Sequence, residues 1–319
     1  MRYRGRKLAK LKIGVVGVGN FGEHHVRVLK EISGVKLVGV VDKDPNRAEY
    51  IGKKYRVPFY THCADLFNKK IDAVTIAVPT EDHYSVARQF IERGIDVLLE
   101  KPMTRNLEEA DELIELADRN GVVLQVGYVE RYNPAVEAAM KFIRSPLVIE
   151  AERIGRFVPR SLDIDVVLDL MIHDIDIALM MARSPVVSVN ARGASVITGR
   201  VDVANARVTF ESGCIGEFMA SRVSTSKLRK VRIFERDAVI TLDYIAQEVE
   251  VEMISRPKGN GSPKRVKKRL KVKREEPLKK ELASFVEVVK KKDLPEVTGK
   301  DARDSLAVAF RIVEGLSIL

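Results

Sequence analysis

The sequence predicts an α/β fold: a doubly wound parallel sheet, followed by an α+β domain with a large, mostly antiparallel open sheet. In the first part, short runs rich in Val, Ile and Leu alternate with stretches of helical length, which indicates a parallel sheet covered on both faces. After Gly127, strand-like runs follow one another directly, as in antiparallel sheets. Because 319 residues exceed one ordinary core, we expect two domains, 1–126 and 127–319.

The elements of the first domain follow from this alternation. The apolar runs lack polar alternation, so each strand should be buried on both faces. The expected strands are 11–16, 35–41, 73–78, 97–99 and 122–126, and the expected helices are 21–32, 45–55, 83–93 and 107–120.

The second domain begins with helical patterns, continues with consecutive strands and ends with two helices. Asp301 is well placed in the first turn of the last helix. The expected helices are 134–144, 166–182, 277–291 and 301–315, and the expected strands are 187–196, 201–210, 214–223, 230–234, 239–242 and 249–254.

Composition restricts the class of protein. Apolar residues make up 45 % and charged residues 31 %, which excludes a disordered chain, and no apolar run reaches the roughly 18 residues of a membrane helix. The basic start and the apolar run 13–18 imitate a secretion signal, but the run is too short. Two cysteines, Cys63 and Cys214, cannot form a disulfide framework, so we expect a cytoplasmic protein.

The net charge of +10 is concentrated in two segments. Residues 1–12 carry six basic side chains and residues 256–274 carry ten, both without an acid. Such patches are typical of phosphate or nucleic-acid contacts, but acids alternate along the strand that precedes the second patch. We therefore expect an exposed hairpin with cross-strand ion pairs, and no nucleic-acid partner. The turn would span 257–261, and the facing residues would be Glu248, Glu250, Glu252, Lys271 and Lys273.

The stretch 17–22, Gly-Val-Gly-Asn-Phe-Gly, follows an expected strand and opens an expected helix. In that context the three glycines permit a tight turn, close approach of backbone to a pyrophosphate, and close helix packing. The start of the helix offers N–H groups to phosphate. The sequence therefore predicts a dinucleotide-binding Rossmann domain with Gly17, Gly19, Asn20, Phe21 and Gly22 at the cofactor.

Asp42 ends the second expected strand, 20 residues after Gly22, where a carboxylate can accept hydrogen bonds from both ribose hydroxyls. A carboxylate there repels the 2′-phosphate of NADP, so we expect NAD as cofactor. Lys43 and Arg47 keep NADP open, because either could hold that phosphate.

These residues resemble the Gfo/Idh/MocA oxidoreductases, named for glucose-fructose oxidoreductase, inositol dehydrogenase and the MocA rhizopine protein. The resemblance covers nearly the whole chain in the right order. It implies a Rossmann domain followed by an open sheet, NAD(P)-dependent oxidation of a sugar or cyclitol hydroxyl, and homo-oligomers built through that sheet. The matching stretches are 17–22, 77–83 (AVPTEDH), 100–102 (EKP) and 169–176 (DLMIHDID).

Lys101 follows the fifth expected strand, at the edge where open α/β sheets bind ligands. Its ammonium could hydrogen-bond the reacting hydroxyl and stabilise developing alkoxide, although a surface lysine at the start of a loop is the simpler alternative. In the family the bond corresponding to Lys101–Pro102 is typically cis.

Asp169 and His173 stand four apart on an expected helix and so share a face. Oxidation of an alcohol must release the hydroxyl proton, and imidazole accepts a proton near neutral pH, so His173 is the expected base. Asp169 would orient His173, favour its imidazolium form, or itself contact the hydroxyl. A structural histidine and a metal site with Asp176 are the alternatives. Because the spacing matches no recognisable metal site, we expect no metal.

Further cofactor and substrate residues come from the resemblance. Pro79, Thr80 and His83 match the segment that lines the nicotinamide, although Thr80 also suits a helix cap, and Glu100 matches a residue near the cofactor ribose. The stretch 127–135 is similar to that of members that oxidise the 3-hydroxyl of UDP-N-acetylglucosamine. There Arg131 could clamp a phosphate or the nicotinamide amide, Tyr132 could stack and Asn133 could bind a hydroxyl. Alternatively, the stretch is a domain hinge before a helix that starts at Pro134.

The sequence thus predicts an NAD-dependent oxidoreductase that converts a secondary hydroxyl of a sugar to a ketone, with a nucleotide sugar as the first choice of substrate. A dehydrogenase of a free sugar or inositol is the next alternative. An NAD-dependent glycosidase and a sensor without turnover stay open, because a fold by itself does not define activity.

Overall fold

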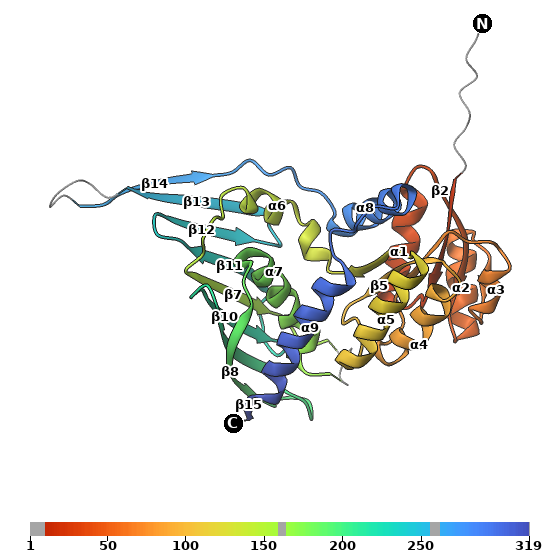
Figure 1. Ribbon diagram of the computed structural model, residues 1–319, viewed down its shortest axis with the longest axis horizontal. Coiled ribbons are helices and arrows are strands. Elements are labelled where there is room, and N and C mark those ends of the chain that lie inside the picture. The colour runs from red at the N-terminus through yellow and green to blue at the C-terminus, as the bar shows by residue number, and fades with distance from the viewer. Residues whose placement is uncertain (1–9, 159–163, 256–261, 319) are drawn as a thin grey trace, which may run out of the picture. The chain divides into compact units, whose positions relative to one another are not determined.

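The computed structural model describes residues 10–158, 164–255 and 262–318. The chain forms two compact units (Figure 1). The first comprises Met1–Gly127 and Leu278–Arg303, and the second comprises Tyr128–Pro277 and Asp304–Leu319. The expected assignment of all of 127–319 to the second domain is therefore wrong for 278–303. This segment returns to the first unit, where Lys279 pairs with Glu31 at 2.9 Å.

The first unit contains a six-stranded, fully parallel sheet in the order β3-β2-β1-β4-β5-β6. The strand order reverses between β1 and β4, so their carboxyl ends border the crevice where such sheets bind ligands. The strands are β1 (Leu11–Val16), β2 (Val35–Val41), β3 (Phe59–Tyr60), β4 (Ala73–Ile76), β5 (Asp96–Glu100) and β6 (Leu124–Gly127).

Helices complete the first unit, and the expected doubly wound arrangement is confirmed. Asp44 caps α2 by accepting the N–H of Asn46 at 2.9 Å, and Asn106 caps α5 by accepting the N–H of Glu109 at 2.8 Å. The helices are α1 (Asn20–Glu31), α2 (Pro45–Tyr55), α3 (Ala64–Phe67), α4 (Thr80–Ile91), α5 (Leu107–Asn120) and α8 (Pro277–Lys291).

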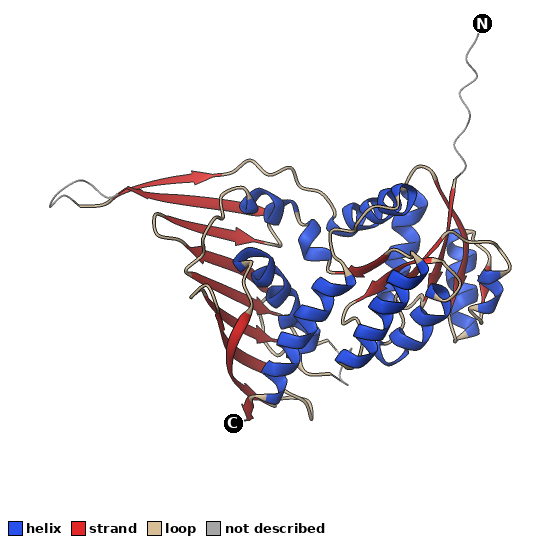
Figure 2. Cartoon of the chain, in the orientation of Figure 1, coloured by secondary structure: helices blue, strands red, loops and turns tan. Residues whose placement is uncertain are grey.

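The second unit is built on a nine-stranded sheet in the order β14-β13-β12-β11-β7-β10-β9-β8-β15 (Figure 2). It is mostly antiparallel, as expected, with parallel pairing only between β7 and β10 and between β8 and β15 among the described strands. The strands are β7 (Val148–Ile154), β8 (Val186–Ala194), β9 (Val203–Phe210), β10 (Ile215–Ser221), β11 (Leu228–Phe234), β12 (Ala238–Asp243), β13 (Glu248–Ser255), β14 (Lys264–Arg269) and β15 (Leu316–Ile318).

Strand β7 was absent from the expected elements, although it pairs with both β10 and β11 in the middle of the sheet. The charged residues of β7 make the strand hard to recognise from the sequence. Glu150 and Glu152 are half-exposed, as expected of one face, but Arg153 is only 2 % exposed. A buried arginine interrupts the apolar alternation by which a half-buried strand is recognised.

The second unit also carries short helices that contact its sheet. α6 packs on β12 and β13, and α7 packs on β7 and β10. The elements are a 3-10 turn (Val129–Tyr132), α6 (Pro134–Met140), a π-helical turn (Val167–Met171), α7 (Ile172–Ala182) and the C-terminal part of α9 (Gly299–Glu314).

The expected hairpin after Glu248 is confirmed, since β13 and β14 pair antiparallel. The acids face different cations from those expected: Lys267 pairs with Glu250 at 2.7 Å and Arg265 with Glu252 at 3.4 Å. The expected turn at 257–261 lies outside the described residues, as does most of the basic segment 1–12. Among the described residues, no helix combines the length and apolar character needed to cross a bilayer.

Candidate functional site

The glycine turn after β1 has the geometry that its sequence predicts. Gly17 has φ +79°, and a Cβ there would lie 2.6 Å from the backbone of Ala77. A Cβ on Gly22 would lie 1.9 Å from the carbonyl oxygen of Gly17, so only glycine allows α1 to begin this close to the strand. A Cβ on Gly19 would meet nothing within 4 Å, which leaves open space beside the start of α1. This arrangement suits a pyrophosphate at the helix N-terminus, where N–H groups are unpaired.

Asp42 follows β2 and holds the same turn. Its Oδ2 accepts the N–H of Val18 at 2.9 Å, and its Oδ1 accepts the N–H of Asp44 at 3.0 Å. Each carboxylate oxygen has a further lone pair, so Asp42 can also accept hydrogen bonds from ribose hydroxyls. The residues present therefore fit an NAD-type dinucleotide.

Of the two cations considered for NADP, Arg47 is engaged elsewhere, whereas Lys43 makes one surface contact. Arg47 donates from Nε to the carbonyl of Val18 at 2.6 Å and from Nη2 to Glu23 at 2.7 Å. Lys43 lies 3.6 Å from the Asp82 carboxylate, and its side chain is largely exposed. A guanidinium held by a carbonyl and a carboxylate is poorly placed to hold a phosphate as well, which favours NAD.

Lys101 directly follows β5, in the first unit, and its bond to Pro102 is cis, as the resemblance implied. His83, on α4, contacts this turn through its ring nitrogens. Its Nδ1 lies 2.8 Å from the carbonyl oxygen of Pro102, and its Nε2 lies 3.0 Å from that of Val78. Burial lowers the pKa of His83, so the ring is neutral and donates only one of these bonds. His83 thus connects the loops after β4 and β5.

Pro79 and Thr80 lie at the beginning of α4, which starts at Thr80. The alternative role of Thr80 as a cap is wrong, because Pro79 occupies the cap position and no side chain caps this end. The backbone of this entry is instead secured by the N–H of Asp82, which donates to the carbonyl of Pro79 at 2.9 Å.

Glu100 ends β5 inside a buried acidic cluster. It is 7 % exposed, and its Oε1 lies 3.1 Å from Nε2 of His25, which is fully buried on α1. Burial, reinforced by the charge of Glu100, raises the pKa of Glu281 on α8 well above its ordinary value. Neither oxygen of Glu281 has a hydrogen-bond partner among the described residues, and burial of the carboxyl group favours its protonated form.

In the second unit, Asp169 and His173 lie where the chain passes from a π-helical turn into α7. The N–H of Ile172 reaches the carbonyl of Val167, five residues back, which widens the turn that carries Asp169. His173 follows in the first turn of α7 and is half-buried, with its ring 6.2 Å from that of Tyr128 in an edge-on contact. Single π-helical turns of this kind occur frequently at functional sites.

Buried ion pairs hold α7 on both sides of this region. Arg153 of β7 binds both oxygens of Asp174, at 2.8 and 2.9 Å. Arg131 binds both oxygens of Asp176, at 2.9 and 2.7 Å. Asp174 follows His173 directly in the sequence, and Asp176 lies two residues further on. The position of its helix is therefore set by two bidentate arginine contacts, the most specific geometry for a carboxylate.

The three residues expected at the substrate lie inside this unit. Arg131 is 9 %, Tyr132 5 % and Asn133 2 % exposed. Asn133 caps α6 by accepting the N–H of Ala135 at 3.1 Å, and its amide donates to the carbonyl of Tyr244 at 3.1 Å. The helix start at Pro134, the simpler alternative for this stretch, is thus present.

A cavity of about 320 Å³ adjoins Asp169 within the second unit. Among the described residues, its lining includes one acid, Asp169, and four cationic side chains. Its lining residues are Gly155, Arg156, Val158, Asp169, Leu170, Arg222, Lys227 and Arg229.

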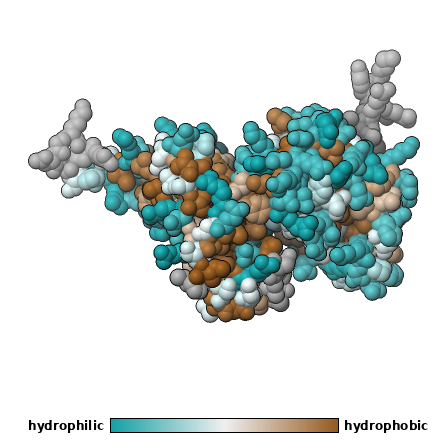
Figure 3. Space-filling model, turned by 60° about the horizontal axis from the view of Figure 1, so that its bottom comes forward, coloured by the Kyte–Doolittle hydropathy of each residue, from teal (hydrophilic) through white to brown (hydrophobic). Residues whose placement is uncertain are grey.

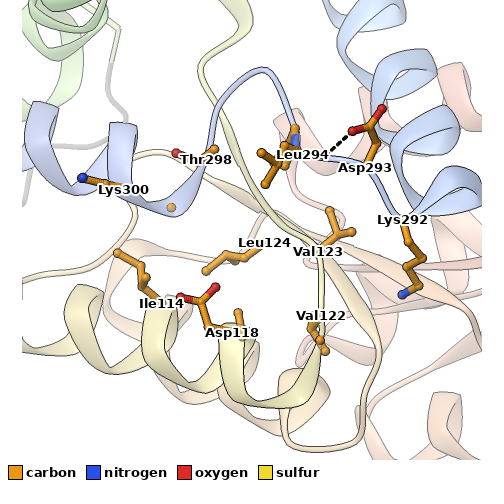
Figure 4. Close-up of a pocket in the computed structure, with 14 residues that line it drawn as sticks. Ile114, Asp118, Val122, Val123, Leu124, Lys292, Asp293, Leu294, Thr298 and Lys300 are labelled. Atoms are coloured by element: carbon orange, nitrogen blue, oxygen red, sulfur yellow. Dashed lines mark hydrogen bonds between the residues drawn. The ribbon is translucent and has the colours of Figure 1, made fainter.

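A larger cavity of about 500 Å³ lies in the first unit, between the end of α5 and the loop that follows α8 (Figure 4). It includes Val122 and Val123, which precede β6, so it lies at the amino ends of the parallel strands. Ligands of open α/β sheets bind at the opposite edge, where Gly17 and Lys101 lie. We therefore do not assign this cavity to the cofactor. Among the described residues, no group of three or more metal-binding side chains is found.

The parallel sheet, the glycine turn at its switch point and the carboxylate after β2 together define a Rossmann domain of the dinucleotide-dependent type. Comparison with protein-family models agrees. A model described as "Oxidoreductase family, NAD-binding Rossmann fold" matches residues 11–128, and the GFO/IDH/MocA C-terminal domain matches residues 142–241. The chain belongs to the GFO/IDH/MocA family of NAD-binding oxidoreductases.

Individual relatives are sugar and inositol dehydrogenases. The chain is 36 % identical over 242 residues to UDP-N-acetylglucosamine 3-dehydrogenase of Acidithiobacillus ferrooxidans, covering 76 % of each chain. It is 29 % identical over 233 residues to scyllo-inositol 2-dehydrogenase (NAD(+)) of Bacillus subtilis, covering 67 % of this chain and 68 % of the relative. A solved structure of the Acidithiobacillus enzyme, GnnA, superposes with a TM-score of 0.90 at 31 % identity, covering 97 % of this chain and 98 % of GnnA.

Several residues around the site were missed by sequence reasoning. Arg153, Glu281 and His25 are charged or polar residues in helical or strand patterns, where a solvent-exposed position is the usual expectation. For His25, the signal was its position three residues after Gly22, on the helix that opens the cofactor turn. For Arg153, the alternation of residues 148–154 was the available signal.

Proposed function

We propose that this oxidoreductase oxidises a secondary hydroxyl of a nucleotide sugar, of the UDP-N-acetylglucosamine type, to a ketone with NAD as the oxidant. The observation that carries the proposal is the similarity to UDP-N-acetylglucosamine 3-dehydrogenase, which extends through both units. The relative and this chain share the Rossmann unit and the open sheet, rather than a single motif.

We assign the chemistry to Lys101, Asp169 and His173. Bound NAD would take the hydride from the carbinol carbon. His173 accepts the hydroxyl proton, Asp169 orients His173 and favours its protonated form, and Lys101 donates a hydrogen bond to the oxygen on which negative charge develops.

For Arg131 and Asn133 we propose positioning roles in place of substrate contacts. Their polar groups already bind Asp176, the backbone of Ala135 and the carbonyl of Tyr244. A buried guanidinium in a bidentate contact would have to abandon that carboxylate to clamp a phosphate, at a cost of several kcal/mol.

The test is turnover of the purified chain with UDP-N-acetylglucosamine and NAD, followed through NADH absorbance. Lys101→Ala and His173→Ala should each reduce kcat about 10²- to 10⁴-fold, the usual contribution of a general acid–base group. Lys36→Ala and His62→Ala are matched controls, because both side chains are exposed in the first unit. Turnover of either site variant at the wild-type rate would exclude this mechanism.

An inositol or free sugar is the second candidate substrate, supported by the similarity to scyllo-inositol 2-dehydrogenase. The same assay distinguishes the two candidates when nucleotide sugars, free sugars and inositols are compared at equal concentration. Higher kcat/KM with an inositol than with any nucleotide sugar would favour the second.

We further propose a homo-oligomer built through the second unit. Apolar side chains that are more than half exposed gather at the β8–β15 end of its sheet, and Figure 3 shows brown side chains in the lower part of this unit. Exposed apolar patches commonly mark interfaces. These side chains are Val187, Val196, Ile197 and Ile318.

We also propose a reducing compartment, the cytoplasm. The cysteines Cys63 and Cys214 are free thiols, and burial raises the pKa of Cys214 to about 11. Cysteines that stay free thiols are typical of reducing compartments.

A further inference from the structure

We propose that Glu23 is a second determinant of the preference for NAD over NADP, and that it acts by holding the Arg47 guanidinium away from the 2′-phosphate that distinguishes NADP. The inference rests on the dinucleotide site of the first unit and is independent of the sugar that this oxidoreductase converts. Glu23 lies in the first turn of α1, and Arg47 lies on α2. Both residues belong to the first unit.

Arg47 lies beside the part of the site that suits the adenosine ribose. Its Nε donates to the carbonyl of Val18 at 2.6 Å, whereas the N–H of Val18 donates to Asp42 at 2.9 Å. Arg47 and Asp42 therefore hold the carbonyl and the N–H of one residue. Because Asp42 is placed to accept ribose hydroxyls, a 2′-phosphate on that ribose would come near both side chains. In dinucleotide-binding domains that take NADP, a nearby arginine accommodates this phosphate.

The contact with Glu23 occupies the guanidinium. Nη2 of Arg47 donates to Oε2 of Glu23 at 2.7 Å, and it has a longer contact of 3.2 Å with the carbonyl oxygen of Gly19. Nε and Nη2 form the side-on pair of donors through which a guanidinium binds an oxyanion. Both nitrogens of this pair are thus engaged, and a phosphate could use them only by displacing Glu23.

Glu23 is an ionised carboxylate held by several donors. Besides Arg47, Nζ of Lys54 donates to its Oε1 at 2.6 Å, and the Tyr55 hydroxyl donates to the same oxygen at 3.1 Å. The hydrogen bond from Lys54, together with those from Arg47 and Tyr55, outweighs burial and lowers the pKa of Glu23 to about 2. At neutral pH the carboxylate of Glu23 therefore occupies the donors of Arg47 and also repels a further anion.

Lys43, the other cation near Asp42, is not held in this way. It lies 3.6 Å from Asp82 and its side chain is 78 % exposed. Because a change at Glu23 does not alter that contact, a gain in NADP binding that passes through Lys43 would not require Arg47. Substitution of Arg47 therefore distinguishes the two routes.

The test is equilibrium binding of NADH and NADPH to the purified full chain without sugar, followed by nicotinamide fluorescence. The measured quantity is the ratio of the two dissociation constants. Glu23→Gln removes the charge but keeps an oxygen that can accept from Lys54 and Tyr55. It should shift the ratio about tenfold toward NADPH, the value of one hydrogen bond to a charged group. A purely structural role of Glu23 in the glycine turn would weaken both cofactors alike and leave the ratio unchanged.

Two combinations test the route through Arg47. Glu23→Gln with Arg47→Gln should have the wild-type ratio, because the released guanidinium is then absent. In the Asp42→Ala background, Glu23→Gln should add a further shift of about tenfold, since loss of the Asp42 charge does not by itself release Arg47.

The matched control is Glu49→Gln, which removes an acid of α2 that pairs with Lys53 at 2.7 Å on the surface. It changes the net charge of the chain equally and should leave the ratio unchanged. Circular dichroism should show that all variants are folded. An unchanged ratio for Glu23→Gln in either background, or a shift that persists in the variant with Arg47→Gln, would overturn the role of Glu23.

The outcomes are separate from those of the proposed function, because binding is measured without sugar. The expected ratios in a chain that oxidises no nucleotide sugar would support the role of Glu23 and remove the proposed function. Turnover of a nucleotide sugar with unaltered ratios would do the reverse.

Discussion

Substitution of Arg153 tests whether buried ion pairs position α7. Its guanidinium binds Asp174 at 2.8 and 2.9 Å and Glu130 at 3.0 Å, and its central carbon lies 5.1 Å from the centre of the Tyr244 ring. Arg153→Met keeps much of the side-chain volume but leaves two buried carboxylates without their principal cation. Breaking a buried pair in this way costs about 3–5 kcal/mol.

That loss is a large share of the roughly 5–15 kcal/mol by which a domain is stable, so the measurement should be made at low temperature. The chain has no tryptophan, and urea unfolding can be followed by tyrosine fluorescence and circular dichroism. Because the two units can unfold separately, the loss should appear in the transition of the second unit.

Arg232→Met is the matched control on the same sheet. Its partner Glu150 lies at 3.0 Å, but the two side chains are 50 % and 35 % exposed, so the expected loss is about 0–1 kcal/mol. In a double-mutant cycle, Arg153→Met with Asp174→Asn should cost less than the sum of the single losses. A loss below about 1 kcal/mol for Arg153→Met, or strict additivity in the cycle, would refute this reasoning.

Three further outcomes are expected. Asp42→Ala should raise KM for NAD about tenfold or more and shift preference toward NADP, because the ribose loses a charged acceptor and the N–H of Val18 loses its acceptor. Steady-state kinetics with both cofactors measures this preference, and an unchanged ratio of kcat/KM for NAD and NADP would contradict the role of Asp42. Gly22→Ala should lower the melting temperature, since its Cβ would clash with the Gly17 carbonyl, whereas Gly19→Ala should fold normally and weaken only NAD binding. Asp202→Asn should reduce the loss of stability that occurs below about pH 4. The folded-state pKa of Asp202 is lowered, so its ionised carboxylate stabilises the fold above the ordinary pKa near 3.9, and this stabilisation is lost as the pH falls.

Local sequence patterns were sufficient for the first unit's central features. The strand–glycine–helix order around Gly17 depends on neighbouring residues only, because a positive φ and a close helix approach are requirements of the backbone itself. The same is true of the hairpin between β13 and β14. The lateral register of that hairpin, which places Lys267 opposite Glu252, required the structure.

The individual roles of charged residues depended on partners distant in the chain. From the sequence, Arg131 was expected as a possible phosphate clamp. In the structure, its guanidinium binds Asp176, 45 residues away. Arg153 interrupts the pattern of a strand at the position where it binds the helix that carries His173. In the sequence, Glu281 has the pattern of an ordinary helix-surface acid. The return of α8 to the first unit buries it beside Glu100.

The amino-acid sequence by itself therefore determined the class of fold and the cofactor turn, since these follow from backbone geometry and from short-range periodicity. The type of chemistry came from its resemblance to a known family. Only the tertiary structure decided which polar residues are buried, that residues 278–303 belong to the first unit, and that Arg156, Lys227 and Arg229 line one cavity with Asp169. The physical reason is that periodicity reports which face of an element avoids water, whereas the partner of a charge is chosen by long-range packing.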